Sequence, residues 1–196
     1  MKAGKNGATT KTPKNILFGA GTIHKGLKFT DNAWNFEQSL VGATSGGSKL
    51  SIVPEITPVE VDGVYVTTKG LQVKTGETAT MEVNFIELST DLVKAAVIGQ
   101  TDSVNAVEGY DLLKSKGDIE EGDYWENIAF VGKTLEGKNI IAILENALCT
   151  SGLELEGKSK EAGVGAFTFQ CHADLAGDEE GDLDVLPWKI YYPTAA

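Results

Sequence analysis

The side chains best suited to metal binding or nucleophilic chemistry are two histidines, His24 and His172, and two cysteines, Cys149 and Cys171. A zinc site needs three or four ligands, and the chain has no HxH, HExxH or CxxC spacing. His172 directly follows Cys171, but adjacent residues of a strand point to opposite faces, so these two side chains do not converge. No GxSxG nucleophile elbow is present. We therefore expect structural histidines, buried free thiols, and a protein that is not an enzyme and holds no cofactor or metal.

Two further segments match ligand-binding motifs only in part. Gly19-Ala-Gly21 begins like a dinucleotide fingerprint, but the third glycine is missing and no helix is expected to follow. The acidic segment 178–184 has Leu183 and Lys189 where an EF-hand loop has Gly and Glu. We expect a pair of strand glycines in the first case and a solvated acidic loop in the second. The three tryptophans are dispersed and are expected to be core or interface anchors: Trp34, Trp125 and Trp188.

Length and composition indicate one globular domain. The chain has 196 residues, of which 41% are hydrophobic; that length is enough to bury roughly 70% of the unfolded surface. No apolar run approaches the ~20 residues that span a bilayer. Residues 1–14 carry charge but no apolar core, so we do not expect a secretory signal there, and we expect synthesis in the cytoplasm.

The charge is unevenly distributed along the chain. The net charge is −11, all 17 basic residues are lysines, and residues 1–30 contain six lysines and no acid. Without arginine the chain lacks the planar fork that binds phosphate in two places, and its net charge opposes adhesion to nucleic acid. We expect residues 1–14 to be a flexible basic arm that can touch an acidic surface, for example on a neighbouring copy.

The spacing of apolar residues changes from strand-like to helical within one segment. Residues 78–88 mostly alternate, with Met81, Val83 and Phe85 on one face, which predicts a half-buried strand. From Ser89 the spacing becomes helical, so we expect a short helix over 89–98 with Ser89 as its N-cap and Gly99 as its C-terminal cap.

The rest of the chain reads as strands and loops. Alternation in 164–175 places Phe167 and Phe169 on one face, and the apolar run 140–144 predicts a strand covered on both faces. We expect two late hairpins over 124–148 and 153–175, long loops at about 42–58 and 100–123, and a turn or bulge at Asp62-Gly63 within the valine-rich segment 59–66. Further strands are expected at 16–24, 29–36, 50–53, 71–74 and 186–192. The fold class is mainly β: a β-sandwich or half-open barrel with one short helix, forming a single domain over 15–196.

This order of elements resembles the major tail tube proteins of long-tailed (siphovirus-like) bacteriophages. The resemblance covers about residues 14–192 and rests on the strand 78–88 that runs into the helix, the acidic loop after it and the two late hairpins. The segment 14–26, Lys-Asn-Ile-Leu-Phe-Gly-Ala-Gly-Thr-Ile-His-Lys-Gly, is also typical of openings in that family.

The resemblance implies a structural virion protein. Six copies would form a ring, and rings would stack into a hollow tube through which DNA passes without specific binding. Expected partners are further copies of the chain together with the tape-measure, tail terminator and tip proteins. The location would be the virion tail, after assembly in the host cytoplasm, with no membrane.

Closed cyclic assembly also suits the pattern physically, because open sheet edges are an aggregation hazard that neighbouring copies can complete. The late hairpins are the candidates for the lumen sheet. Residues expected at subunit contacts are Lys5, Lys11, Lys14, Gly46, Pro54, Asp111, Glu120 and Tyr124. Residues expected on the lumen face are Thr168, Gln170 and His172.

Three alternatives stay open. The first is the inner-tube protein of a contractile injection or type VI secretion-like system, which would be accompanied by a sheath protein. The second is a monomeric β-sandwich that binds carbohydrate or a cell surface through an exposed tryptophan. The third is a small enzyme on a cupin-like barrel, which the two widely separated histidines disfavour.

Overall fold

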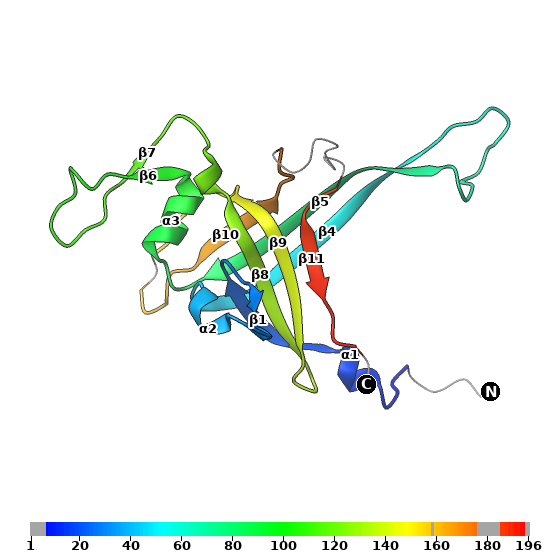
Figure 1. The fold of residues 1–196 in the computed structure, drawn as a ribbon, viewed down its shortest axis with the longest axis horizontal. Coiled ribbons are helices and arrows are strands. Elements are labelled where there is room, and N and C mark those ends of the chain that lie inside the picture. Colours follow the sequence, from blue (N-terminus) through cyan, green and yellow to red (C-terminus); the bar gives the residue numbers. More distant parts are fainter. Residues whose placement is uncertain (1–6, 158, 176–184, 195–196) are drawn as a thin grey trace.

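The computed structural model describes residues 7–157, 159–175 and 185–194. The described chain is mainly β, and its principal sheet curls into a half-barrel (Figure 1). Strand order in this sheet is β1-β8-β9-β10-β5-β4, and β11 pairs with β9 beside β10. The expected mainly-β class with one short helix, at about 89–98, is confirmed.

The strands of the main sheet are β1 (Leu17–His24), β4 (Thr44–Pro58), β5 (Gln72–Phe85), β8 (Trp125–Thr134), β9 (Asn139–Cys149), β10 (Gly165–Cys171) and β11 (Trp188–Tyr191). Two small hairpin sheets accompany it, formed by β2 (Phe29–Thr30) with β3 (Ala33–Trp34) and by β6 (Gly99–Thr101) with β7 (Leu113–Ser115). The helical elements are α1 (Thr12–Asn15), α2 (Phe36–Ser39), α3 (Thr90–Val97) and a 3-10 turn, Glu121–Asp123. None of the described helices is long and apolar enough to cross a membrane.

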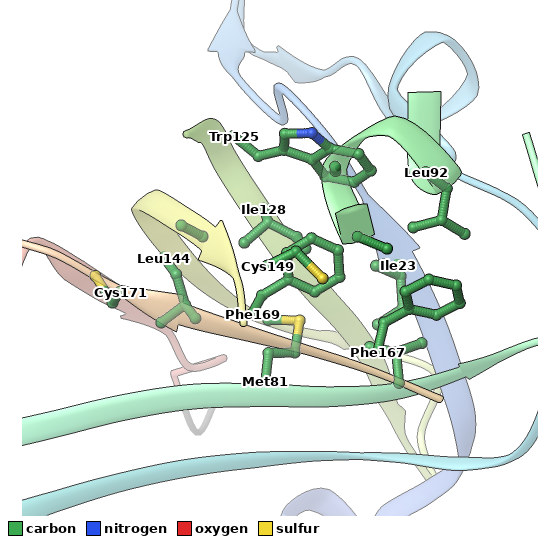
Figure 2. Packing of buried hydrophobic residues seen from close by; sticks show 14 of the residues in the cluster. Ile23, Met81, Leu92, Trp125, Ile128, Leu144, Cys149, Phe167, Phe169 and Cys171 are labelled. Carbon is green, nitrogen blue, oxygen red and sulfur yellow. The ribbon is translucent and has the colours of Figure 1, made fainter. Parts of the chain in front are cut away.

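The main core lies between the β5–β10 part of the sheet, the start of β8 and α3 (Figure 2). Phe167 and Phe169 of β10 are buried here, as the alternation predicts, and the Phe169 ring lies 5.0 Å from that of Trp125. Strand β9 contributes to two clusters: Leu144 belongs to the main core, while Ile143 packs in a smaller one. The expectation that this strand is covered on both faces is confirmed.

The helix after β5 is confirmed, with one correction at its end. Ser89 is the N-cap, and its hydroxyl oxygen accepts a hydrogen bond from the backbone N–H of Leu92 at 3.2 Å. The left-handed C-cap is Ile98, at φ 48°, and not Gly99. Gly99 instead begins β6, where an added Cβ would lie 3.0 Å from the Lys114 carbonyl oxygen, so close strand packing accounts for the glycine.

The prediction of a loop at about 42–58 is wrong for most of its length, because residues 44–58 form β4. Gly46 and Gly47 adopt φ of 82° and 88° within an irregularity of the β4–β5 register. Such a bulge interrupts the alternation without ending the strand. Pro54 does not end it either, because β4 is the last strand of the sheet order and an edge strand tolerates a missing N–H donor.

The prediction of a second late hairpin over 153–175 is also wrong. Residues 153–156 form no strand, although leucine and glutamate alternate there. Strand β10 pairs with β9 through Phe169 and Cys149 and with β5 through Phe169 and Met81. One edge of β10 is therefore occupied by the preceding strand β9, and the other by β5, which is distant in sequence. The first late hairpin is confirmed as β8 and β9.

Residues 100–123 are mostly loop, as expected, but they carry some order of their own. β6 and β7 pair with each other beside α3, and the 3-10 turn closes the segment. The Lys116 ammonium lies 3.0 Å from the Glu120 carboxylate and 2.6 Å from the Asp123 carboxylate. These contacts lie within the segment and stabilise its last turn, which directly precedes β8.

Candidate assembly surfaces

The two histidines occupy separate, structural positions. In β1 the buried His24 ring lies 2.9 Å from the Ser39 hydroxyl through Nδ1 and 2.9 Å from the Thr22 hydroxyl through Nε2. The His172 ring follows β10 and packs edge-on against Tyr124 with 5.5 Å between centroids. Within the described ranges no group of three or more His, Cys, Asp and Glu side chains is arranged to hold a metal.

The two cysteines are free and buried. Burial raises the pKa of both thiols, which outweighs the hydrogen bonds that favour the thiolate. The tryptophans are also packed: Trp125 belongs to the core, Trp34 lies 5.0 Å from the ring of Tyr191, and the Trp188 indole N–H donates to Glu77. The expectations of buried thiols and of tryptophans as anchors are therefore confirmed.

The burial of the histidines makes stability depend on pH. Burial lowers the pKa of His24 against an opposing backbone hydrogen bond at Phe36, and burial also lowers the pKa of His172. In the unfolded chain both groups titrate near 6.5, so below that pH the unfolded state binds more protons than the folded state. We expect the free energy of unfolding to fall as the pH drops from 7.5 to 5.5. Urea denaturation at both pH values measures this change.

The matched variant is His24→Gln, whose amide can still bond to Ser39. It should show a smaller loss of stability between the two pH values, because one of the two titrating groups is gone. An unchanged pH dependence in this variant would contradict the role given to His24.

The most prominent surface feature is a two-stranded arm that projects from the body (Figure 1). We define the arm as residues 54–77, the part of β4 and β5 beyond the pairing with β10, together with the connection between them. Its apolar side chains are exposed, and Tyr65 near the tip is 94% exposed. The exposed apolar residues of the arm are Ile56, Val59, Val61, Val64, Tyr65, Val66 and Val73. A two-stranded ribbon is marginally stable on its own in water, so this arm is suited to contact another surface.

The arm is anchored where it leaves the body. The indole N–H of Trp188 in β11 donates to a carboxylate oxygen of Glu77 at 3.0 Å, and the Lys74 ammonium lies 2.9 Å from the same carboxylate. The hydrogen bond from Lys74, followed by that from Trp188, lowers the pKa of Glu77. These contacts hold the root of the arm against β11 and so fix the direction in which it projects.

Among the described residues, β1 and β4 are the end strands of the sheet order, and neither pairs with a further strand on its outer side. The segment before β4 covers the last residues of the β1 edge: His24 and Leu40 form an isolated antiparallel bridge, and the Val41 N–H donates to the Ile23 carbonyl oxygen at 3.0 Å. Open edges promote pairing with another chain unless they are blunted. The prolines at 54 and 58 remove two donors from the β4 edge, and the rest of its outer side is available.

One face of β4, β5 and β10 is a polar surface. Lys49, Glu82 and Thr168 form one row across the three strands. Ser51, Thr80 and Gln170 form the next row. The Lys49 ammonium lies 2.8 Å from the Glu82 carboxylate, so the charges of these rows compensate each other. Thr168 and Gln170, expected on a lumen face, lie here.

The structure brings three of the expected site residues together elsewhere. Glu120, Tyr124 and His172 line a hollow of about 740 Å³ at the start of β8. The buried Nε2 of His172 has no hydrogen-bond partner among the described residues. His172 thus lies beyond the end of β10, apart from the two rows of the polar surface.

The remaining expected contact residues are dispersed. Lys5 lies outside the described residues, Lys11 precedes α1 and Lys14 lies within it. Asp111, in the β6–β7 segment, accepts a hydrogen bond from the Thr90 hydroxyl at 2.8 Å. Gly46 and Pro54 lie on β4, as described above.

A second hollow, of about 490 Å³, lies between β1, β8 and α2. The register of β1 shifts between Phe18 and Thr22, where Gly19 and Gly21 have φ of 90° and 72°. Both glycines lie within β1, as expected, and Phe18 beside the register shift is 67% exposed and lines the hollow. An added Cβ on Gly21 would lie 2.5 Å from the Phe130 ring, so glycine permits the close approach.

The sequence analysis predicted neither the projecting arm nor this hollow. The available signal for the arm was the spacing of valines and isoleucine from 53 to 73 on both sides of the Asp62-Gly63 turn, where Gly63 has φ 82°. No protein-family model matches the chain, and no curated protein matches it significantly.

Proposed function

We propose that this protein is the tube-forming subunit of a bacteriophage tail, with six copies in a ring and rings stacked into a hollow tube that conducts DNA. The observation that carries the proposal is the exposed apolar arm on a curled sheet whose end strands, β1 and β4, pair with no further strand among the described residues. Exposed apolar side chains and unpaired strand edges both raise the free energy of a single copy in water. Covering them with an identical neighbour lowers that free energy. The resemblance to tail tube proteins supplies the number of copies and the genome as cargo.

Ring closure would use the sheet edges. β1 and β4 are the first and last strands of the sheet order, so the β4 edge of one copy can face the β1 edge of the next. A contact between two different surfaces of the same chain is heterologous, and it repeats until a ring closes or a filament grows. Backbone hydrogen bonds between copies would then complete the sheet around the tube.

The polar surface of β4, β5 and β10 is our candidate for the lumen wall. Its hydroxyl and amide side chains, with the Lys49–Glu82 ion pair, offer passing phosphates no unpaired cation on the two rows described. Phosphate binding by proteins depends mainly on lysine and arginine. A wall with compensated charge would let DNA pass without being retained.

Electron microscopy of the purified protein at rising concentration tests the proposal. We expect short hollow tubes or rings with sixfold end views, together with light scattering that rises above a threshold concentration. Protein that stays monomeric at every concentration and is absent from virions would overturn the proposed function.

A further inference from the structure

The hollow beside β1 is open and has a largely apolar lining, with one cation, Lys133, and one carboxylate, Glu37, among its lining residues. Phe18, Phe36, Leu40 and Val131 supply apolar lining, and both Phe18 and Leu40 are exposed. Lys133 lies directly opposite Phe18 in the β1–β8 pairing and also lines the hollow. An exposed phenylalanine beside an open hollow is a surface that favours an apolar occupant.

The tip of the arm has the complementary chemistry. Val64 and Tyr65 are exposed apolar side chains, and Glu60 and Asp62 place two carboxylates beside them. Gly63, at φ 82°, forms the tight turn that presents these residues together. An aromatic side chain such as Tyr65 can pack against the apolar lining, and a carboxylate beside it can pair with the Lys133 side of the hollow rather than with the Glu37 side.

The two surfaces cannot meet within one copy. The arm leaves the body on the side away from β1 and α2, and its root is fixed by the Trp188–Glu77 hydrogen bond (Figure 1). β4 has 15 residues, and at about 3.3 Å per residue such a strand extends about 50 Å. The tip is therefore held far from the hollow of its own chain and is available to a second copy.

We propose that the hollow between β1, β8 and α2 receives the arm tip of a second copy, with Tyr65 inserted against Phe18 and Asp62 facing Lys133. This inference rests on the proposed function and adds to it the residues at the head-to-tail contact. Because the contact joins two different surfaces, each copy both donates a tip and accepts one, and the series of copies continues.

Disulfide cross-linking between two single variants tests the contact. Tyr65→Cys and a longer, tagged Phe18→Cys protein are mixed, assembled and oxidised, and mixed-length dimers are counted on a non-reducing gel. The native thiols are buried and do not compete. The matched control replaces Phe18→Cys by Val104→Cys, a position that is 89% exposed in the β6–β7 segment.

We expect mixed dimers from Tyr65→Cys with Phe18→Cys in at least about tenfold excess over those with Val104→Cys, because effective concentration rises sharply at a formed contact. Tubes in which both pairs cross-link equally would overturn this inference and leave the proposed function standing. Wild-type protein that forms no tubes or rings would overturn the proposed function itself.

A charge exchange gives an independent readout. Lys133→Glu should raise the concentration needed for assembly at least about tenfold, since it places like charges together. Adding Asp62→Lys to the same chain should bring the concentration needed for assembly most of the way back to the wild-type value. A double variant as impaired as the single one would contradict the proposed pairing of Asp62 with Lys133.

Discussion

Excision of the arm is expected to leave a folded monomer that no longer assembles. Residues 56–75 would be replaced by Asn-Gly, because Glu55 and Gly76 are paired and a two-residue turn of this type closes a hairpin between paired residues. As strands, the excised residues pair only with each other, so the body keeps its core and the Trp188–Glu77 hydrogen bond and loses only the Lys74–Glu77 ion pair at the root. The free energy of unfolding should change by less than about 1 kcal/mol, since a shorter connection costs slightly less chain entropy.

Assembly should respond far more strongly than stability does. Loss of a contact centred on an aromatic side chain weakens association by about 2 kcal/mol or more, so the threshold concentration should rise at least about thirtyfold. Light scattering measures the threshold, and urea denaturation measures the stability. The matched control is Thr67→Ala, a polar position of the same connection, which should assemble as the wild type does. Normal tubes from the excised protein would contradict the role given to the arm.

Local patterns in the sequence were sufficient to predict several elements. Phe167 and Phe169 alternate with polar residues, and strict alternation has few interpretations other than a half-buried strand. Ser89 followed by helical spacing predicts α3 because the cap hydroxyl and the periodicity are both local signals. In each case the physical cause lies within a few residues of its effect.

Pairings between distant segments were not predictable in the same way. β10 is interior to the sheet because β5, some eighty residues earlier, fills one of its edges. The sequence of residues 153–175 does not indicate that β10 pairs with β5, so a local hairpin was the simplest interpretation. β4 was missed for a related reason: a bulge at Gly46 and an edge position for Pro54 make a strand resemble a loop.

The candidate surfaces were the hardest part to predict. Valines in the arm and valines in the core look alike in sequence, and Val64 and Val83 differ only in what surrounds them in the fold. The hollow beside β1 depends on a register shift that neighbouring strands determine. Exposure of an apolar side chain is a property of the folded chain, so this kind of site emerges only from the structure.

Phe169→Ala is expected to cost about 3–5 kcal/mol of unfolding free energy, enough to unfold a marginal domain. Phe169 is fully buried at the point where β5, β9 and β10 meet, and its ring contacts Trp125 of β8. Removing the ring leaves a cavity that four strands border, and a curled sheet can close around it only in part.

The neighbouring residue provides the control for this prediction. Gln170 points to the polar surface, so Gln170→Ala should change stability by no more than about 0.5 kcal/mol. Urea denaturation of both variants measures the difference, and circular dichroism reports whether Phe169→Ala folds at all. Equal effects from the two substitutions would mean that β10 does not separate a core face from a polar face, and the polar surface of β4, β5 and β10 would then lose its place as the candidate lumen wall.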